Sequence, residues 1–324
     1  MAKRTLKLPP ILISSKRYSF GYVNHVSFEL RTRLEVEGSR GCGDFHLAEN
    51  AAALTLSNGE TVIVTDKRNV VRPNDVDGVL YEYPDGRVRW DSHKLLDSFE
   101  KEYGDENWGK LRRDVNASWR DATSYRSERR DKKGYVIEKG LRPPQLGALH
   151  AIGAHWSIHS APATVVMPTG TGKTESMLAT LANFIDGTVL VVVPSRALRD
   201  QTARKFRTYG LLRELQCLSP SAMNPIVAVL DHRVKDPQEM EVLKHCNVLI
   251  ATISTVAQGE AVELAKDLAG ICSHLVFDEA HHVPADTYSA FRDIFKEKLI
   301  LQFTATPFRR DGKQLEGKTI FRIR

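Results

Sequence analysis

Two stretches of the sequence combine the residue types that phosphate and metal chemistry need. The first, Met167-Pro168-Thr169-Gly170-Thr171-Gly172-Lys173-Thr174, follows an apolar, β-branched run over Ala163–Met167 and opens a helical pattern. A Gly-rich turn between a strand and a helix N-terminus directs backbone N–H groups and the positive end of the helix dipole at an anion. Gly170 and Gly172 let the backbone approach phosphates closely, because neither residue carries a Cβ.

The side chains after the two glycines complete a predicted nucleoside triphosphate site. We expect Lys173 to reach the β- and γ-phosphates and the Thr174 hydroxyl to ligate Mg²⁺. Met167 stands where the general phosphate-loop pattern has its first glycine. By itself the stretch therefore leaves an alternative open, a Gly-rich turn with a surface lysine.

The second stretch, His274-Leu275-Val276-Phe277-Asp278-Glu279-Ala280-His281-His282, is an apolar run that ends on two adjacent carboxylates. Asp278 can hold a Mg²⁺ ion that bridges two phosphates, and Glu279 can orient and deprotonate the attacking water. The alternative is an acidic turn that merely ends a strand. His281 and His282 suggest zinc only weakly, because no third ligand follows at metal spacing.

Each motif stands at the end of an expected buried strand. From Pro143 onward, apolar runs alternate with helical patterns, the first of which covers about Pro144–Ile158. The expected strands are Ala163–Met167, Val189–Val193, Ile226–Leu230, Val248–Ile253, His274–Phe277 and Leu299–Phe303. Continuous apolar strands that alternate with helices predict an α/β fold with a parallel sheet covered on both faces. Such sheets bind ligands at the carboxyl ends of their strands, where the motifs lie.

Composition narrows the class of protein. The 324 residues suffice for two domains with their own cores, and the net charge of +6 suits a polyanionic partner without proving one. The four cysteines show no C-x-x-C spacing, which argues against a disulfide scaffold or a zinc ribbon. The sequence has no convincing signal peptide and no apolar run long enough for a membrane span, so we expect a cytoplasmic protein without a membrane partner.

The first part of the chain has a different pattern. Residues 11–90 read mostly as short strands with turn signals, and residues 94–133 read as highly charged helix. Nucleic acid could contact the aromatic and arginine side chains of the predicted hairpin over residues 80–90, or the basic helix. The alternatives are a packed sheet edge and a solvated helix. Gly134 and Gly140 mark a boundary, so we expect a smaller α+β accessory domain over residues 1–138.

The motifs, taken together, resemble those of a known family. Met-Pro-Thr-Gly-Thr-Gly-Lys-Thr, Asp-Glu-Ala-His and then Thr304-Ala305-Thr306-Pro307, in this order, resemble superfamily 2 helicases of the DEAD/DEAH-box type. The run Arg309-Arg310-Asp311-Gly312 is most similar to the branch around type III restriction enzyme helicase subunits. The similarity covers roughly residues 141–312, and a methionine at the position of Met167 is unremarkable in that family. It implies a RecA-like fold over residues 139–324 that uses ATP and Mg²⁺.

The resemblance also assigns roles to single residues. It implies that Gln145 reads adenine, and that Thr169, Gly170, Thr171 and Gly172 hold the phosphates with Lys173 and Thr174. It implies nucleic-acid contacts for Ser195, Arg196, Thr252 and Thr255, and a coupling role for His281, Thr304 and Thr306. A surface glutamine is the alternative at Gln145, and helix capping is the alternative at Ser195, Thr252 and Thr255.

The expected function is that of an ATP-dependent nucleic-acid helicase or translocase, with DNA favoured over RNA. A helicase of this type needs a second RecA-like domain with arginines that close on the γ-phosphate, and we expect that domain to be absent from this chain or supplied by a partner subunit. The alternative is a non-hydrolysing module that binds ATP and DNA. A role in restriction or phage defence rests on the resemblance alone.

Overall fold

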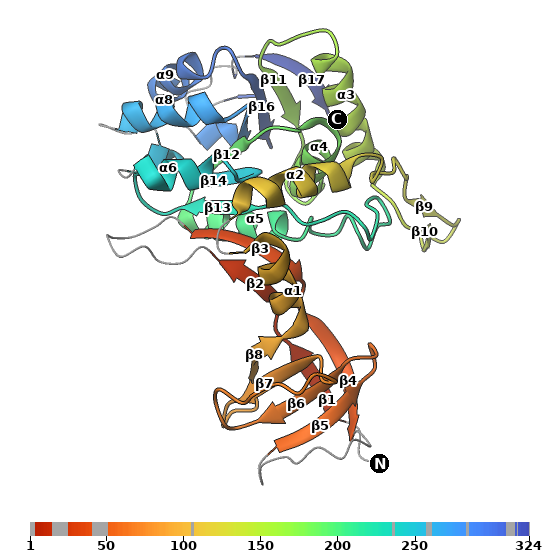
Figure 1. Cartoon of the computed structure of the whole chain (residues 1–324). Helices are drawn as coiled ribbons and strands as arrows, with labels where there is room; N and C mark the ends of the chain where they lie inside the picture. Colours follow the sequence, from red (N-terminus) through yellow and green to blue (C-terminus); the bar gives the residue numbers. More distant parts are fainter. Residues whose placement is uncertain are drawn as a thin grey trace. The chain divides into compact units, whose positions relative to one another are not determined.

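The chain forms two compact units in the computed structural model (Figure 1). Unit 1 comprises residues 1–13 and 29–107, and unit 2 comprises residues 14–28 and 108–324. The structure describes residues 4–14, 25–40, 51–104, 107–234, 237–256, 261–282, 285–308, 315 and 317–323. Residues 108–138, which the sequence analysis assigned to the accessory domain, pack within unit 2.

Unit 1 is built on a six-stranded sheet in the order β1-β4-β5-β6-β7-β8. The elements are β1 (Arg4–Leu8), β4 (Leu34–Arg40), β5 (Ala51–Leu56), β6 (Thr61–Thr65), β7 (Gly78–Glu82), β8 (Val88–His93) and α1 (Lys94–Tyr103). Neighbouring strands are antiparallel except for β6 and β7, which are parallel. The expected strands at residues 51–56, 61–65 and 79–83 are therefore present.

Alternating side chains form the core of unit 1. In β1, Leu6 and Leu8 are buried while their neighbours are exposed, as a strand with one face in the core requires. They pack with other aliphatic side chains of the sheet: Val36, Leu54, Leu56, Val62, Val64 and Leu80. Trp90 packs against this cluster, and its ring lies so close to Gly78 that a Cβ there would approach it to 2.7 Å.

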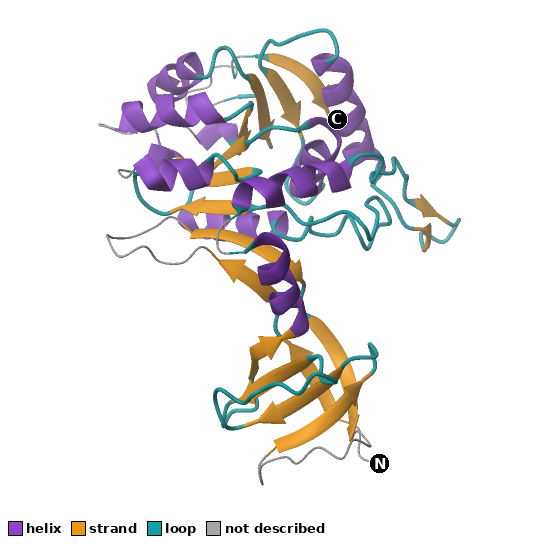
Figure 2. Ribbon diagram, in the orientation of Figure 1, coloured by secondary structure: helices purple, strands orange, loops and turns teal. Residues whose placement is uncertain are grey.

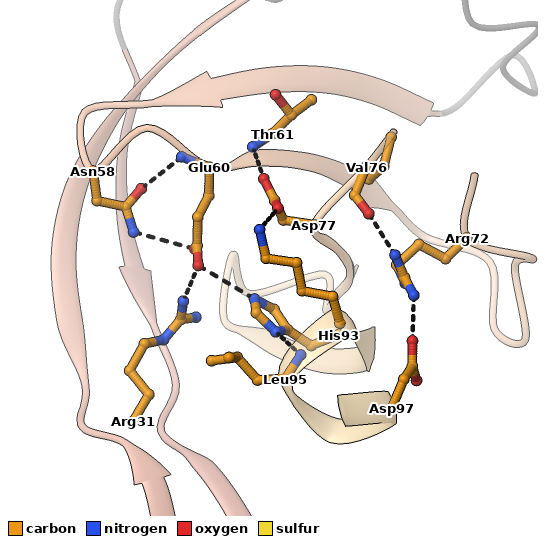
Figure 3. A network of polar contacts seen from close by, with 11 residues as sticks. Arg31, Asn58, Glu60, Thr61, Arg72, Val76, Asp77, His93, Leu95 and Asp97 are labelled. Carbon is orange, nitrogen blue, oxygen red and sulfur yellow. Dashed lines mark hydrogen bonds and ion pairs between the residues drawn. The ribbon is translucent and has the colours of Figure 1, made fainter. Parts of the chain in front are cut away.

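A network of polar side chains in unit 1 surrounds Glu60, Asp77 and His93 (Figure 3). His93 is fully buried and caps α1, because its Nδ1 accepts the backbone N–H of Leu95 at 3.0 Å. Its Nε2 lies 3.5 Å from a carboxylate oxygen of Glu60, which is also paired with Arg31. Asp77 accepts from the backbone N–H of Thr61 at 2.6 Å and is paired with the Lys94 ammonium. Buried charge is thus compensated in this network.

Unit 2 contains a largely parallel sheet whose strands follow the order β17-β11-β16-β15-β12-β14-β13-β3. Its strands are β11 (Ala163–Val166), β12 (Val189–Val193), β13 (Val227–Leu230), β14 (Val248–Thr252), β15 (His274–Asp278), β16 (Leu299–Thr304) and β17 (Lys318–Arg322). β3 (His25–Arg31) follows β2 (Ile11–Ser14) in the chain and pairs antiparallel with β13 through residues 25–27. The strands from β17 to β13 are all parallel.

Helices cover both sides of this sheet (Figure 2). The helices of unit 2 that the structure describes are α2 (Trp108–Trp119), α3 (Pro143–Trp156), α4 (Lys173–Phe184), α5 (Arg196–Phe206), α6 (Pro237–Leu243), α7 (Ile253–Val256), α8 (Ala261–Ile271), η1 (Ala280–His282) and α9 (Ala285–Ile294). All five residues of β12, of β14 and of β15 are buried, which explains their unbroken apolar runs. The predicted α/β fold with a RecA-like parallel sheet is confirmed. No described helix is long and apolar enough to cross a membrane.

One prediction about secondary structure is wrong. The charged pattern over residues 94–133 was expected to be helical, but α2 ends at Trp119 and the chain continues as turns and a two-stranded hairpin, β9 (Arg129–Arg130) and β10 (Val136–Glu138). Asp121 adopts a φ of 56°, a left-handed conformation that a helix cannot contain. The composition favours a helix, and the local backbone overrides it.

Candidate nucleotide site

The strand order brings the chemical motifs to one edge of the sheet. β16 lies between β11 and β15, and in register Val166 stands opposite Thr304 while Asp278 stands opposite Phe303. Because the three strands are parallel, their carboxyl ends meet at the same edge. The loop after β11, the carboxylates after β15 and the threonines after β16 are therefore neighbours.

The loop between β11 and α4 has the geometry of an anion site. The backbone N–H of Met167 donates to the carbonyl of Thr304 at 2.9 Å, and the Thr171 hydroxyl donates to the carbonyl of Pro168 at 2.6 Å. Gly170 and Gly172 have φ values of 82° and 94°, which strongly favour glycine. Gly172 is the N-cap residue of α4 and has no side chain to accept from the first helical N–H groups. Those donors can therefore serve an anion.

Lys173 and Glu279 form an ion pair across the motifs, from the start of α4 to the end of β15. The lysine side chain is 9% exposed and the glutamate side chain 18%. Glu279 adopts a φ of 53°, an uncommon conformation for a residue other than glycine. Backbone strain of this kind is concentrated at functional sites.

Asp278 lies beside this ion pair and is almost completely buried. Burial raises the pKa of its carboxyl to about 6, the negative charge of Glu279 adds to the shift, and Lys173 opposes it. Among the described residues, no donor reaches Oδ1 of Asp278, although this atom is shielded from solvent. A buried carboxylate oxygen without a donor is a suitable ligand for a hard cation such as Mg²⁺.

A chain of polar contacts runs from the carboxylates to the end of β16. Nδ1 of His281 lies 3.4 Å from a carboxylate oxygen of Glu279 and 3.0 Å from the Thr304 hydroxyl. The Thr304 hydroxyl donates to the carbonyl of Thr306 at 2.7 Å, and Thr304 is fully buried. The structure thus brings together the three residues to which the resemblance gave a coupling role.

Gln145 lies against the phosphate loop, the loop of residues 167–172 between β11 and α4. The Gln145 side chain is buried, unlike the surface glutamine considered as an alternative. Its Oε1 accepts from the backbone N–H of Arg142 at 2.8 Å, and its Nε2 lies 3.5 Å from the carbonyl of Gly172. The Arg142 guanidinium donates to the carbonyl of Gly170 at 3.3 Å. Sequence reasoning missed this arginine, because a single Arg before Pro143-Pro144 carries no motif.

The predicted nucleic-acid contacts lie at the neighbouring strand ends of β12 and β14. Ser195 and Arg196 are exposed, and the Ser195 hydroxyl accepts from the backbone N–H of Leu198 at 3.3 Å, so this serine also caps α5. The Thr252 hydroxyl lies 2.9 Å from that of Thr255. Val193 pairs with Thr252 in the sheet, which places the two groups side by side.

Among the residues that the structure describes, no group of three or more His, Cys, Asp or Glu side chains is arranged to hold a metal ion by itself. Residues 309–312, which contributed to the resemblance, lie outside the described residues, as does the side chain of His282.

A curated relative, the DNA 3'-5' translocase XPB2 of Sulfurisphaera tokodaii, is 28% identical over 163 residues, which are 49% of this chain and 31% of the relative. The chain thus spans about a third of that relative's length.

Solved helicase structures give weaker matches. The Hef helicase domain of Pyrococcus furiosus is 24% identical, with a TM-score of 0.33 over 49% of this chain and 33% of that one. The UvsW helicase of bacteriophage T4 is 16% identical, with a TM-score of 0.37 over 68% of this chain and 71% of that one. The family model described as "Type III restriction enzyme, res subunit" matches residues 138–309, more than half of the sequence. This chain therefore belongs to the family of type III restriction enzyme res subunits.

Proposed function

We propose that this chain binds ATP with Mg²⁺ and is the ATP-hydrolysing part of a nucleic-acid helicase or translocase that acts on DNA. The observation that carries the proposal is the joint position of Lys173, Asp278 and Glu279 beside a Gly-rich helix N-terminus. The family assignment supports a helicase-type function. The XPB2 relative is named as a DNA translocase, which favours DNA as the substrate.

Each residue has a role that follows from its chemistry. Lys173 supplies positive charge to the β- and γ-phosphates, and the N–H groups of the loop and of α4 bind phosphate oxygens. Asp278 and the Thr174 hydroxyl would hold Mg²⁺, which would supply charge neutralisation on the phosphates. Glu279 orients the attacking water and accepts its proton. The amide of Gln145 offers both a donor and an acceptor, and pairing with the edge of adenine would replace its contacts with Arg142 and Gly172.

The ion pair between Lys173 and Glu279 must open before either residue can act. A bound phosphate offers the ammonium group a more highly charged partner, and the freed carboxylate can then reach the water. Glu279 also lies within 3.4 Å of His281, which contacts Thr304. A change at the carboxylate can therefore be transmitted to the end of β16, where Thr304 and Thr306 lie.

Nucleic acid is proposed to cross the ends of β12 and β14. Ser195 and Arg196 would contact one strand's phosphates, and Thr252 and Thr255 would contact the same strand. An arginine from a second RecA-like domain or from a partner subunit would complete charge stabilisation during hydrolysis. Participation in a restriction or defence system is the further proposal that the family membership supports.

Two variants test the nucleotide site. Lys173→Ala should lose ATP binding in calorimetric titration, whereas Glu279→Gln should bind ATP at nearly unchanged affinity and lose hydrolysis. Lys266→Ala is a matched control, because Lys266 is exposed on α8 and pairs only with the nearby Glu263 among the described residues. Unchanged ATP affinity in the Lys173 variant would show that the nucleotide binds elsewhere.

Hydrolysis by the chain itself separates the proposal from its rival, a non-hydrolysing module that binds ATP and DNA. ATPase activity of residues 1–324 that rises when DNA is added, and that Glu279→Gln abolishes, excludes the passive module. ATP binding without turnover, with or without DNA, favours it. The same pair of assays repeated with RNA decides which nucleic acid stimulates the enzyme.

A further inference from the structure

Residues 125–139 form an exposed segment of unit 2 that ends in the β9–β10 hairpin (Figure 1). Large apolar side chains are unusually concentrated here. Among the described residues, eight large hydrophobic side chains are exposed, and four of them belong to this segment: Tyr125 (47%), Tyr135 (70%), Val136 (46%) and Ile137 (57%). Grouped exposed apolar side chains mark a binding surface more often than isolated ones do.

The same segment is strongly basic. Six of its side chains are basic and three are acidic, and they are Arg126, Arg129, Arg130, Lys132, Lys133 and Lys139 against Glu128, Asp131 and Glu138. Arg129 is paired with Glu138, and Arg130 with Glu128 at 2.6 Å. Among the residues that the structure describes, Lys132 and Lys133 form no ion pair. Lys132 and Lys133 therefore place two positive charges at the tip of the hairpin, next to Tyr135, against the one negative charge of Asp131.

The tip has a defined conformation. A carboxylate oxygen of Asp131 accepts from the backbone N–H groups of Lys133 and Tyr135, both at 2.9 Å, and the backbone N–H of Asp131 donates to the carbonyl of Tyr135 at 2.9 Å. Gly134 takes the left-handed conformation, with a φ of 88°, that closes the turn. Tyr135 is therefore presented to solvent by a fixed turn.

The base of the hairpin is tied to the segment that contacts the phosphate loop. The backbone N–H of Leu141 donates to the carbonyl of Arg126, and the backbone N–H of Glu128 donates to the carbonyl of Leu141, both at 2.8 Å. Gly140 passes so close that a Cβ would lie 2.5 Å from the carbonyl carbon of Ser127. The next residue after this anchor is Arg142, whose guanidinium donates to the carbonyl of Gly170.

We propose that the β9–β10 hairpin is a contact site for single-stranded nucleic acid. Lys132 and Lys133 pair with backbone phosphates, and Tyr135 stacks on a base. Aromatic and cationic side chains side by side are the combination that binds unpaired strands without reading their sequence. The inference rests on the nucleic-acid half of the proposed function and adds a site outside the ends of β12 and β14.

Binding measurements can test the two parts of this site separately. The full 324-residue chain is titrated against labelled oligo(dT), labelled oligo(U) and a blunt DNA duplex, by fluorescence anisotropy at several salt concentrations. The logarithm of the association constant falls linearly with the logarithm of the salt concentration. Changing both Lys132 and Lys133 to Ala should make this slope shallower by about 1.4 on oligo(dT), since each phosphate contact of a single strand contributes about 0.7. The matched control changes Lys266 and Lys296, two exposed lysines of unit 2, to Ala and should leave the slope unchanged.

Tyr135→Ala should weaken single-strand binding by about 5-fold to 150-fold, the range for the loss of one stacked base, and should affect the duplex less. Ile158→Ala is the control for loss of an exposed apolar side chain, since Ile158 is 75% exposed. The oligo(dT) and oligo(U) arms distinguish DNA from RNA. Equal effects on both mean that the site recognises the backbone and bases that the two polymers share.

A photochemical experiment gives a direct readout. Oligonucleotides with 5-bromouracil are irradiated with the chain, and trypsin then releases the peptide Gly134–Lys139, which contains Tyr135. A cross-link on this peptide supports the site. The inference is overturned if the chain binds the oligonucleotide while the Lys132/Lys133 and Tyr135 variants bind it equally well and this peptide stays unmodified. If the unaltered chain binds ATP but no nucleic acid at all, the nucleic-acid half of the proposed function fails as well.

Discussion

Acid should destabilise unit 1 through one buried histidine, His93. Its side chain is fully buried, and burial lowers its pKa from 6.5 to about 4, with a further lowering by Arg31. The negative charges of Glu60 and Asp77 oppose the shift without cancelling it, and Lys94 adds slightly to it. In the folded unit His93 therefore stays neutral at a pH where the unfolded chain already binds a proton.

The sign and size of the effect follow from proton linkage. Because the unfolded state binds more protons below pH 6.5, the stability contributed by neutral His93 is present above that pH and is lost as the pH falls toward 4. With pKa values of 6.5 and about 4, the loss between pH 7 and pH 5 is about 2 kcal/mol, and the limiting loss at lower pH is about 3 kcal/mol. Asp77, whose pKa is lowered from 3.8, titrates below this window.

Hydrogen exchange of the buried strand β6 (Thr61–Thr65), corrected for the intrinsic effect of pH, measures the opening free energy of unit 1. The informative variant is His93→Asn, because asparagine is a good N-cap and keeps an acceptor for the N–H of Leu95 while losing the titration. Between pH 7 and pH 5, we expect the opening free energy of unit 1 to fall by about 2 kcal/mol less in this variant than in the unaltered chain. His150→Asn, at an exposed histidine of unit 2, should leave β6 unaffected. Equal pH dependence in the unaltered chain and in His93→Asn would refute the reasoning.

Three other substitutions probe unit 2. Gly172→Ala should reduce ATP affinity by about 5-fold to 30-fold in calorimetry, because a φ of 94° costs other residues about 1–2 kcal/mol, and the new Cβ would displace the amide of Gln145. Gly140→Ala should loosen the hairpin base and destabilise it by about 1–3 kcal/mol, seen as faster cleavage of the hairpin by trypsin at a limiting protease concentration. Asn247→Leu should lower the free energy of unfolding by about 1–3 kcal/mol in urea titration, because Ile226 would lose a side-chain acceptor at 3.0 Å.

Much of unit 2 could be predicted from the sequence because its strands are buried on both faces. The five apolar residues of β12 leave little choice of structure, and the same is true of β15 up to Asp278. The site followed from motif order, since the carboxyl ends of parallel strands meet at one edge. The order itself, with β16 between β11 and β15, could not be predicted from periodicity and became visible only in the fold.

The rest depended on contacts distant in sequence. The hairpin strands β9 and β10 have two and three residues, too few to show an alternating pattern, and their charged composition favours a helix. β3 joins the sheet of unit 2 through His25–Ser27 and Val227–Val229, about 200 positions apart in the chain. No local pattern reports such a pairing. The same holds for the ion pair between Lys173 and Glu279, which depends on the positions of two strand ends.

The order of contacts along residues 126–174 has a consequence for how ATP and nucleic acid are coupled. The base of the hairpin is hydrogen-bonded to Leu141. The side chains of Arg142 and Gln145 lie against the glycines of the phosphate loop, and this loop leads directly into Lys173. A phosphate that draws Lys173 away from Glu279 must therefore act on a loop whose carbonyls are held by this segment. Because packed and hydrogen-bonded segments move together, binding of nucleic acid at the hairpin and binding of the ATP phosphates at the loop should influence each other. Coupling of this kind is reciprocal, so oligonucleotide affinity should change with bound nucleotide by the same factor as nucleotide affinity changes with bound oligonucleotide.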